Sequence, residues 1–187
     1  MSSLIKSIDS KFNDLKVAID TDRGKWVSSQ GANALILVYP PGEEKEYLKR
    51  VKNDYADQHI INISDLFVKL IDDVGIETFK QGYKMYYSSP ESIFYGPDRE
   101  QTDLFDLIID EITKAREEKR IPILIRTGML YGAHIRNKDI LEHKIVNKGE
   151  KPLIIFYPGT VKKDISDKER VWFLGVQKAS DYRGQLI

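Results

Sequence analysis

The segment of residues 126–136 holds the residue types best suited to recognition chemistry. It reads Arg-Thr-Gly-Met-Leu-Tyr-Gly-Ala-His-Ile-Arg, which combines two arginines and a histidine with apolar groups and two hinge glycines. A guanidinium can bind a phosphate or a carboxylate of a partner through two parallel hydrogen bonds. We expect a partner- or phosphate-binding surface here; an equally weighted alternative is that Arg126 pairs with an internal acid and Tyr131 packs. The candidate residues are Arg126, Thr127, Tyr131, His134 and Arg136.

A second candidate surface lies near the C-terminus, where Trp172-Phe173-Leu174-Gly175 is followed by Tyr182 and Arg183. Aromatic residues and arginine are the types that dominate binding energy at protein interfaces. Packing of an edge strand would explain most of the same residues. We add Tyr182 and Arg183 to the candidate binding residues.

A phosphate-binding loop after the first strand is disfavoured by its own residues. A phosphate cradle needs glycines followed by lysine and serine or threonine. The chain has Tyr-Pro-Pro-Gly-Glu-Glu-Lys at residues 39–45 instead. Two prolines remove backbone N–H donors, and two glutamates repel phosphate. We therefore predict no Walker A motif and no bound cofactor.

The histidines do not predict a metal site. His59, His134 and His143 show neither HxxxH nor HExxH spacing, and a lone loop histidine is usually solvated. The chain also has no cysteine and no G-x-S-x-G sequence, so a nucleophilic triad is not expected.

A group of aspartates is the remaining catalytic hypothesis. Asp103, Asp106 and Asp110 recur at spacings that place them on one face of a helix. Such a face is typical of a helix exposed to solvent. A metal-dependent nuclease or phosphatase using Asp103, Asp106 or His134 is the least favoured function, and we predict no catalytic residues.

Three apolar runs that stop at glycine must position these residues. Residues 34–42, 121–128 and 152–159 each read as a buried strand that ends in Pro-Gly or Thr-Gly. In open α/β sheets, ligands bind at the carboxyl ends of the strands. The Arg126–Arg136 segment follows the second of these runs, so we expect it at the functional edge.

Strands alternate with helices along the chain, which predicts parallel βαβ units. The expected fold is α/β: a three-layer, mostly parallel sheet flanked by helices, similar to P-loop NTPases or Rossmann folds but without a Walker A motif. One domain covers residues 1–187, and the last two strands can add an antiparallel C-terminal edge. Expected strands are 35–39, 59–63, 121–125, 153–157, 171–176 and a short one within 182–187; expected helices are 3–19 (amphipathic), 43–56, 65–74, 76–87, one capped by Thr102 or Asp103, and 137–146.

The composition is that of an ordinary soluble domain. The 187 residues include 29 Lys plus Arg and 29 Asp plus Glu, so no overall charge steers the chain toward nucleic acid or an anionic membrane. Without cysteine, and with no apolar run of signal-peptide or membrane-span type, the expected location is cytoplasmic.

Several motifs in their order along the chain resemble one protein family. Tyr-Pro-Pro-Gly-Glu-Glu ends the first strand, Gly-Met-Leu-Tyr-Gly-Ala-His-Ile-Arg follows the third, and Phe-Tyr-Pro-Gly (156–159) and Phe-Leu-Gly (173–175) precede Tyr182-Arg183. This order resembles the BrxB family of BREX phage-defence systems, over most of the chain. The sequence departs from the family pattern at Asp181 and Gly184, where tyrosine and alanine are expected.

The resemblance implies a small, non-catalytic component of a bacterial antiviral system that confers phage resistance. Its partners would be a PglZ-like protein of alkaline-phosphatase fold, beside a methyltransferase and a large ATPase, through protein–protein interaction. No catalytic residue carries over from the family. The alternative function from the residues alone is a nucleotide- or nucleic-acid-sensing regulatory protein that uses the Arg126–Arg136 segment.

Overall fold

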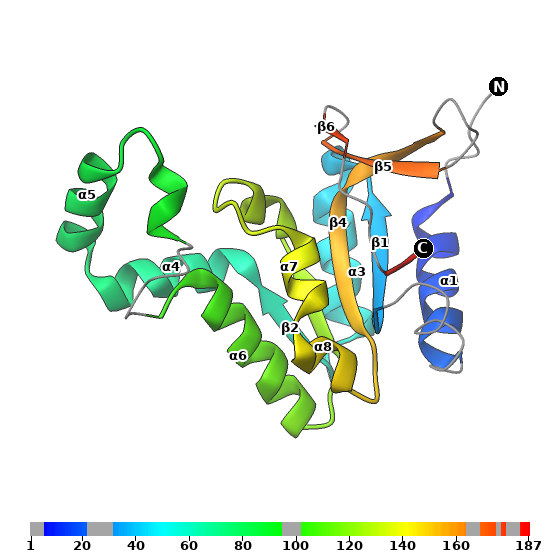
Figure 1. Ribbon diagram of the computed structural model, residues 1–187. Helices are drawn as coiled ribbons and strands as arrows, with labels where there is room; N and C mark the ends of the chain where they lie inside the picture. The colour runs from blue at the N-terminus through cyan, green and yellow to red at the C-terminus, as the bar shows by residue number, and fades with distance from the viewer. Residues whose placement is uncertain (1–5, 22–31, 95–101, 164–168, 175–176, 179–183) are drawn as a thin grey trace.

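The computed structural model describes residues 6–21, 32–94, 102–163, 169–174, 177–178 and 184–187. It is an α/β fold built on a mostly parallel sheet flanked by helices, as the alternating pattern predicts (Figure 1). The strands are β1 (Ala34–Tyr39), β2 (His59–Asn62), β3 (Pro122–Ile125), β4 (Leu153–Lys163), β5 (Glu169–Phe173), β6 (Gln177–Lys178) and β7 (Gln185–Leu186). The helices are α1 (Ile8–Asp20), α3 (Glu44–Asp54), α4 (Ile63–Val74), α5 (Ile76–Met85), α6 (Leu104–Glu117), α7 (Asn137–Glu142) and α8 (Lys144–Lys148), with 3-10 turns η1 (Pro41–Glu43), η2 (Pro90–Ile93) and η3 (Thr127–Tyr131).

The main sheet has the strand order β2-β3-β4-β1-β7, with every neighbouring pair parallel. β1 lies inside the sheet, and all six of its residues are buried. A strand covered on both faces needs apolar residues at every position rather than at alternate ones, which explains its uniform sequence Ala-Leu-Ile-Leu-Val-Tyr.

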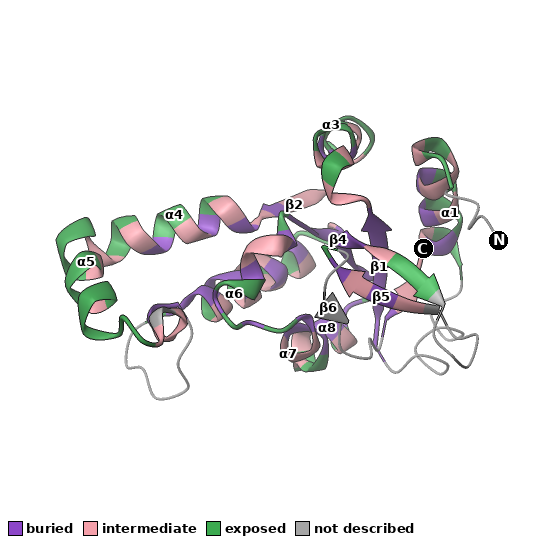
Figure 2. Cartoon of the chain, turned by 90° about the horizontal axis from the view of Figure 1, so that it is seen from above, coloured by how far each residue is buried: buried purple, intermediate pink, exposed green. Residues whose placement is uncertain are grey.

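Helices cover both faces of this sheet and bury two separate apolar clusters (Figure 2). On one face, α1 and α3 pack against side chains such as Leu35 and Phe156. On the other face, α4, α6, α7 and α8 pack against alternate side chains such as Ile36 and Ile155. The result is the expected three-layer arrangement.

Capping side chains set where the helices begin. Asp103 accepts a hydrogen bond from the Asp106 backbone N–H while Asp106 accepts one from that of Asp103, so the pair forms a capping box for α6. Asn62, not Ser64, caps α4, so α4 begins two residues earlier than expected. Ser7 caps α1, which starts at Ile8; the earlier part of the expected 3–19 helix, before Lys6, lies outside the described residues.

The helix expected over residues 137–146 is two short helices instead. His143 has extended backbone dihedrals, ends α7 and caps α8 by accepting a hydrogen bond from the Ile145 backbone N–H. A side chain that bonds its own local backbone competes with helix continuation.

β4 is longer than the sequence predicts, because Tyr157-Pro158-Gly159 is not a stop. Leu153–Pro158 pairs with β1, and the strand then continues to Lys163 as an antiparallel partner of β5. A Cβ on Gly159 would lie 2.7 Å from the Trp172 carbonyl oxygen, so glycine is what lets the two backbones approach here. We name this antiparallel extension, Gly159–Lys163 with β5 and β6, the ribbon.

The C-terminal edge of the main sheet is parallel, which corrects the expectation for the last strand. β7 pairs in parallel with β1, whereas the antiparallel pairs belong to the ribbon. β5 also begins and ends earlier than the 171–176 expected from its apolar residues.

α5 and η2 form an arm that projects from the body of the protein, at the left of Figure 1. The arm is joined to the sheet by α4. Its helix α5 ends at Met85 rather than continuing to Tyr87, and none of its residues is buried. No helix in the described ranges has the length and apolar content needed to cross a bilayer.

Candidate functional site

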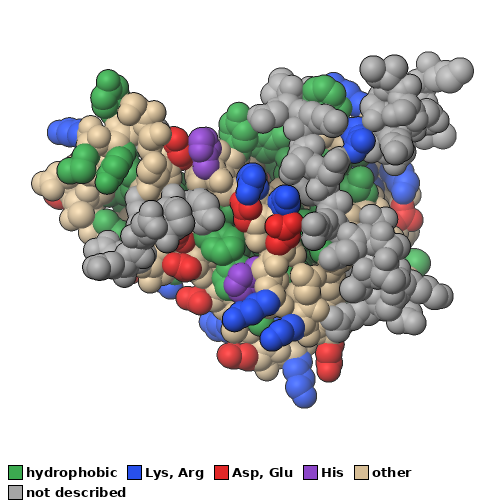
Figure 3. Space-filling view, viewed as in Figure 1, with side chains coloured by type: hydrophobic (Ala, Val, Ile, Leu, Met, Phe, Trp, Pro, Cys, Tyr) green, Lys and Arg blue, Asp and Glu red, His purple; other side chains and the backbone are tan. Residues whose placement is uncertain are grey.

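The loop after β3, residues 126–136, lies between the ribbon and the arm. Its first half is the 3-10 turn η3, and it leads into α7. Figure 3 shows apolar side chains gathered over this loop and, separately, over α5. The strand before the loop, β3, lies inside the parallel sheet, and the loop begins at its carboxyl end, as the sequence predicts.

Two contacts hold the loop against β4 and the ribbon. The Thr127 hydroxyl donates to the Phe156 carbonyl oxygen at 2.7 Å and is buried. A Cβ on Gly128 would lie 3.3 Å from the Pro158 ring, so the backbone passes close to the strand. Thr127, a predicted binding residue, thus has an internal partner, and its contribution is to position the residues that follow.

Arg126 is exposed and has strained backbone geometry. Its φ of 57° and ψ of 34° lie in the left-handed region, which costs a residue with a side chain about 1–2 kcal/mol. Among the described residues, its guanidinium makes no hydrogen bond and no ion pair. Such strain at a strand end is characteristic of binding sites held by the surrounding fold.

A cluster of polar and charged side chains lies beside Arg126, at the end of β1. The Tyr39 hydroxyl donates to Glu44 Oε1 at 2.9 Å. Burial raises the pKa of Tyr39 far above its ordinary value, with the Glu44 bond and charge adding to the shift and the charge of Arg126 opposing it. Lys11 reaches in from α1 to donate to the Val38 carbonyl, and burial lowers the pKa of this lysine. The position that holds a phosphate cradle in nucleotide-binding sheets thus contains a tyrosine–glutamate pair.

Tyr131 forms a rigid aromatic contact and yet remains accessible. Its ring stacks on Phe173 of β5, with 5.0 Å between centroids, and 58% of the residue is exposed. Phe173 in turn packs against Tyr157. The stacking fixes one face of the Tyr131 ring and leaves the other to solvent.

His134 connects the loop to the arm. Its Nδ1 lies 3.7 Å from Glu91 Oε1, in η2. The pKa of Glu91 is lowered, chiefly by a hydrogen bond from its own backbone N–H and also by the Ser89 hydroxyl and by His134. His134 itself is exposed and has a φ of 54°.

Arg136 forms the internal ion pair that the sequence alternative assigned to Arg126. Its Nη2 and Nε donate to the two oxygens of Asp139 at 2.6 and 3.0 Å. Its backbone N–H donates to the same carboxylate. The pair stabilises the start of α7, so Arg126, not Arg136, is the loop arginine available to a partner.

Of the other candidate residues, two aspartates cap a helix and two residues lie outside the part of the chain that the structure describes. Asp103 and Asp106 form the cap of α6, which accounts for their spacing without a metal. In the part of the chain that the structure describes, no group of three or more His, Asp or Glu side chains is placed to bind a metal ion. Tyr182 and Arg183 lie outside the described residues.

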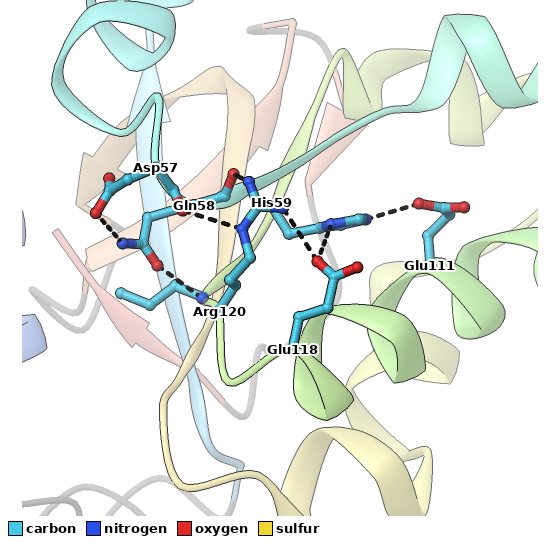
Figure 4. A network of polar contacts seen from close by, with 7 residues as sticks. Asp57, Gln58, His59, Glu111, Glu118 and Arg120 are labelled. Carbon is cyan, nitrogen blue, oxygen red and sulfur yellow. Dashed lines mark hydrogen bonds and ion pairs between the residues drawn. The ribbon is translucent and has the colours of Figure 1, made fainter.

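A polar network at the opposite edge of the sheet was missed by sequence reasoning (Figure 4). His59 Nε2 lies 2.7 Å from Glu111 Oε2, and its Nδ1 lies 3.7 Å from Glu118 Oε2. Because a carboxylate can only accept, Nε2 must donate. Glu111 lies in α6 and Glu118 is the residue that ends it, seven residues later and so on the same side; this spacing is the only sign in the sequence that both contact one histidine.

Arg120 extends this network and fixes the approach to two strands. It donates to Glu118 at 3.0 Å and to the backbone carbonyls of Asp57 and Gln58, just before β2. Gln58 Oε1 accepts from the Ile121 backbone N–H at 2.8 Å, just before β3. The network joins the end of α6 to the amino ends of β2 and β3, away from the carboxyl ends of the strands, and is a structural element.

Comparison of the chain with family models, with curated proteins and with solved structures found no match.

We predict that Arg126→Gly stabilises the fold. Glycine adopts the left-handed conformation without the Cβ penalty, so the free energy of unfolding should rise by roughly 0.5–1 kcal/mol after the added entropy of the unfolded chain is subtracted. Urea unfolding measures the change. Arg126→Ala keeps the strain and should give no gain, whereas Lys119→Gly, at a φ of 54° after α6, should give a similar gain. A loss of stability in Arg126→Gly would show that the arginine side chain holds the loop.

We predict a pH-dependent difference between the wild-type protein and Tyr39→Phe. At neutral pH the variant lacks the bond to Glu44 and should be less stable by about 1 kcal/mol. Above about pH 10 the unfolded chain ionises Tyr39 while the folded protein keeps it protonated, so the wild type loses this stabilisation as pH rises.

By about pH 11 that loss should reach roughly 1 kcal/mol, reduced by screening at the sheet edge, and the two proteins should become nearly equal in stability. Urea unfolding at both pH values tests this. Tyr83→Phe, at an exposed tyrosine of the arm, is the control. A gap of constant size across the pH range would contradict the buried, protonated state of Tyr39.

Proposed function

We propose that this protein is a non-catalytic adaptor of a bacterial antiviral defence complex of BREX type. It docks onto a PglZ-like partner of alkaline-phosphatase fold through the loop 126–136 and the adjoining ribbon. Two independent lines support the proposal: the order of motifs that resembles the BrxB family, and the chemistry of the side chains that the loop presents.

The observation that carries the proposal is the pairing of Arg126 with Tyr131 on one short loop. Arg126 is an exposed cation that forms no salt bridge with the described residues, and Tyr131 is an exposed ring held in place by Phe173. Tyrosine and arginine are enriched among residues that dominate interface energies. A ring already fixed by stacking loses little conformational entropy when a partner covers it.

The ribbon extends this surface with exposed apolar groups. Val161 and Leu174 are 39% and 48% exposed, and Lys162 lies 5.0 Å from the centre of the Trp172 ring. Lys162 lies on the other face of the ribbon from Val161, so Arg126 is the cation on which this surface relies. It fits a protein surface that offers carboxylates, because a carboxylate can accept both hydrogen bonds of the Arg126 guanidinium.

We predict that Arg126→Ala and Tyr131→Ala each weaken capture of the PglZ-like partner by at least about tenfold. The measurement is co-purification of the tagged protein with the PglZ-like protein and the large ATPase encoded beside it, followed by titration of the purified pair. Lys49→Ala and Val17→Ala, exposed on α3 and α1, are the matched charged and apolar controls. The adaptor function would be contradicted if neither the PglZ-like protein nor the ATPase co-purifies, or if all variants recover them equally.

A nucleotide- or nucleic-acid-sensing function is the second candidate, and the location of Arg126 favours it. The residue lies at the carboxyl edge of a parallel sheet, close enough to influence the pKa of Tyr39. Thermal unfolding with ATP, GTP, cyclic nucleotides and short DNA tests this candidate. A bound ligand at a hundredfold excess over its dissociation constant stabilises the protein by about 2.7 kcal/mol, and Arg126→Ala should abolish the effect. No shift with any of these compounds removes this candidate.

A further inference from the structure

Helix α5 has one face held by the arm and another face left open. On the inner face, Phe79 packs against Phe94 with 5.6 Å between ring centroids, and Gly82 lies against Ile93. The adjoining face carries an apolar stripe, which we name the α5 stripe: Ile76, Lys80 and Tyr83, with Tyr87 in the turn just after the helix. Ile76, Tyr83 and Tyr87 are 54%, 52% and 79% exposed.

The charges beside the α5 stripe are arranged so that the helix complements itself. Glu77 near the start and Lys84 near the end are seven residues apart, so they flank the same side of the stripe. If a second α5 lies antiparallel across the first, Glu77 of each copy lies close to Lys84 of the other. Both charged pairs form at once, related by a twofold axis.

The stripe matches itself in an antiparallel register two residues, or about 3 Å, away from the one that sets Glu77 level with Lys84, an offset that these long charged side chains can span. Ile76 of one copy lies opposite the partner's Tyr87, and Lys80 lies opposite the partner's Tyr83. The first pair buries apolar surface, and the second places a cation over an aromatic ring. In the single chain, Lys80 forms an exposed ion pair with Glu77 at 2.7 Å. An exposed pair contributes little free energy, so Lys80 can leave it for the partner's ring.

We propose that α5 is a homodimer contact, in which a second copy of this chain packs antiparallel against the α5 stripe. Self-complementarity distinguishes a second copy from an unrelated partner, because a twofold contact requires one patch to match itself. Here α5 and Tyr87 in the turn after it meet that requirement for their apolar, aromatic and charged positions to within an offset of two residues.

The size of the contact sets its strength. Ten residues of helix span about 15 Å, and a single pair of such helices buries less than the roughly 1,200–2,000 Å² of stable complexes. The dimer should therefore form in a concentration-dependent way. The contact uses the arm and leaves the loop 126–136 free, so it is independent of the proposed adaptor function.

Sedimentation equilibrium of the full chain over a concentration series tests the apolar part of the proposal. The wild type should show a monomer–dimer equilibrium, and Tyr83→Glu should weaken it by at least about tenfold, because each dimer contains the change twice. Val17→Glu, at a residue of α1 that is 68% exposed, should dimerise as the wild type does. Circular dichroism should show both variants folded, since neither position is buried. A wild type that stays monomeric at every concentration overturns the proposal.

A charge exchange tests the antiparallel register. Lys84→Glu should weaken the dimer by roughly tenfold, since two attractive pairs become repulsive. The double variant Glu77→Lys/Lys84→Glu restores opposite charges across the twofold axis and should recover most of the wild-type affinity. Lys84→Glu that dimerises normally, or a double variant no better than the single one, overturns the antiparallel α5 contact. Binding of the PglZ-like partner should be unchanged in these variants, so failure of this proposal and failure of the adaptor function are separate results.

Discussion

The parallel pairing of β1 with β4 is the constraint on which the rest of the fold depends. Six residues of β1, from Ala34 to Tyr39, pair in register with Leu153–Pro158, although more than a hundred residues separate the two strands in sequence. The buried side chain of Asn33 fixes the amino end of this pair by donating to the carbonyls of Gly149 and Lys151 at 2.7 and 3.1 Å. Both carbonyls lie in the turn before β4, so the buried amide ties the residue before β1 to the start of β4 and helps to set the register of the two strands.

The continuation of β4 beyond this pairing explains the shape of the candidate site. Once past Pro158, the strand has no β1 residue beside it, and β5 supplies its next hydrogen-bonding partner. The ribbon that results brings Phe173 beside Tyr131, while Phe156, in the part of β4 that pairs with β1, accepts the hydrogen bond from Thr127. The loop after β3 is therefore supported by residues from the far end of the chain, and this support can maintain the left-handed strain at Arg126.

The polar groups at the two ends of the parallel strands differ in how far the fold pairs them. At the amino edge, His59, Arg120 and two glutamates satisfy one another and tie α6 to two strands. At the carboxyl edge, by contrast, Arg126 and Tyr131 present groups that the fold positions but does not cover. Polar groups that are fully paired contribute to stability, whereas those positioned and left open are available for binding.

The sequence by itself determined the fold class and most element positions, because these depend on local patterns. Uniform apolar runs predict buried parallel strands, and residue spacing predicted α6 and its capping aspartate. Even the ion pair of Arg136 with Asp139 has a local spacing of three residues that could have revealed it. The choice between Arg126 and Arg136 as the available cation was left open, because the sequence does not give side-chain directions.

Features that depend on contacts between residues far apart in the sequence were decided only by the tertiary structure. Pro158-Gly159 resembles a stop when judged from its own dihedral preferences, but β5 arrives to pair with the residues that follow. In the same way, Tyr131 becomes an anchored ring through Phe173, and His59 gains its partners from α6. The exposure of the α5 stripe also follows only from the tertiary structure. Apolar residues at helical spacing look the same in sequence whether another element covers them or not.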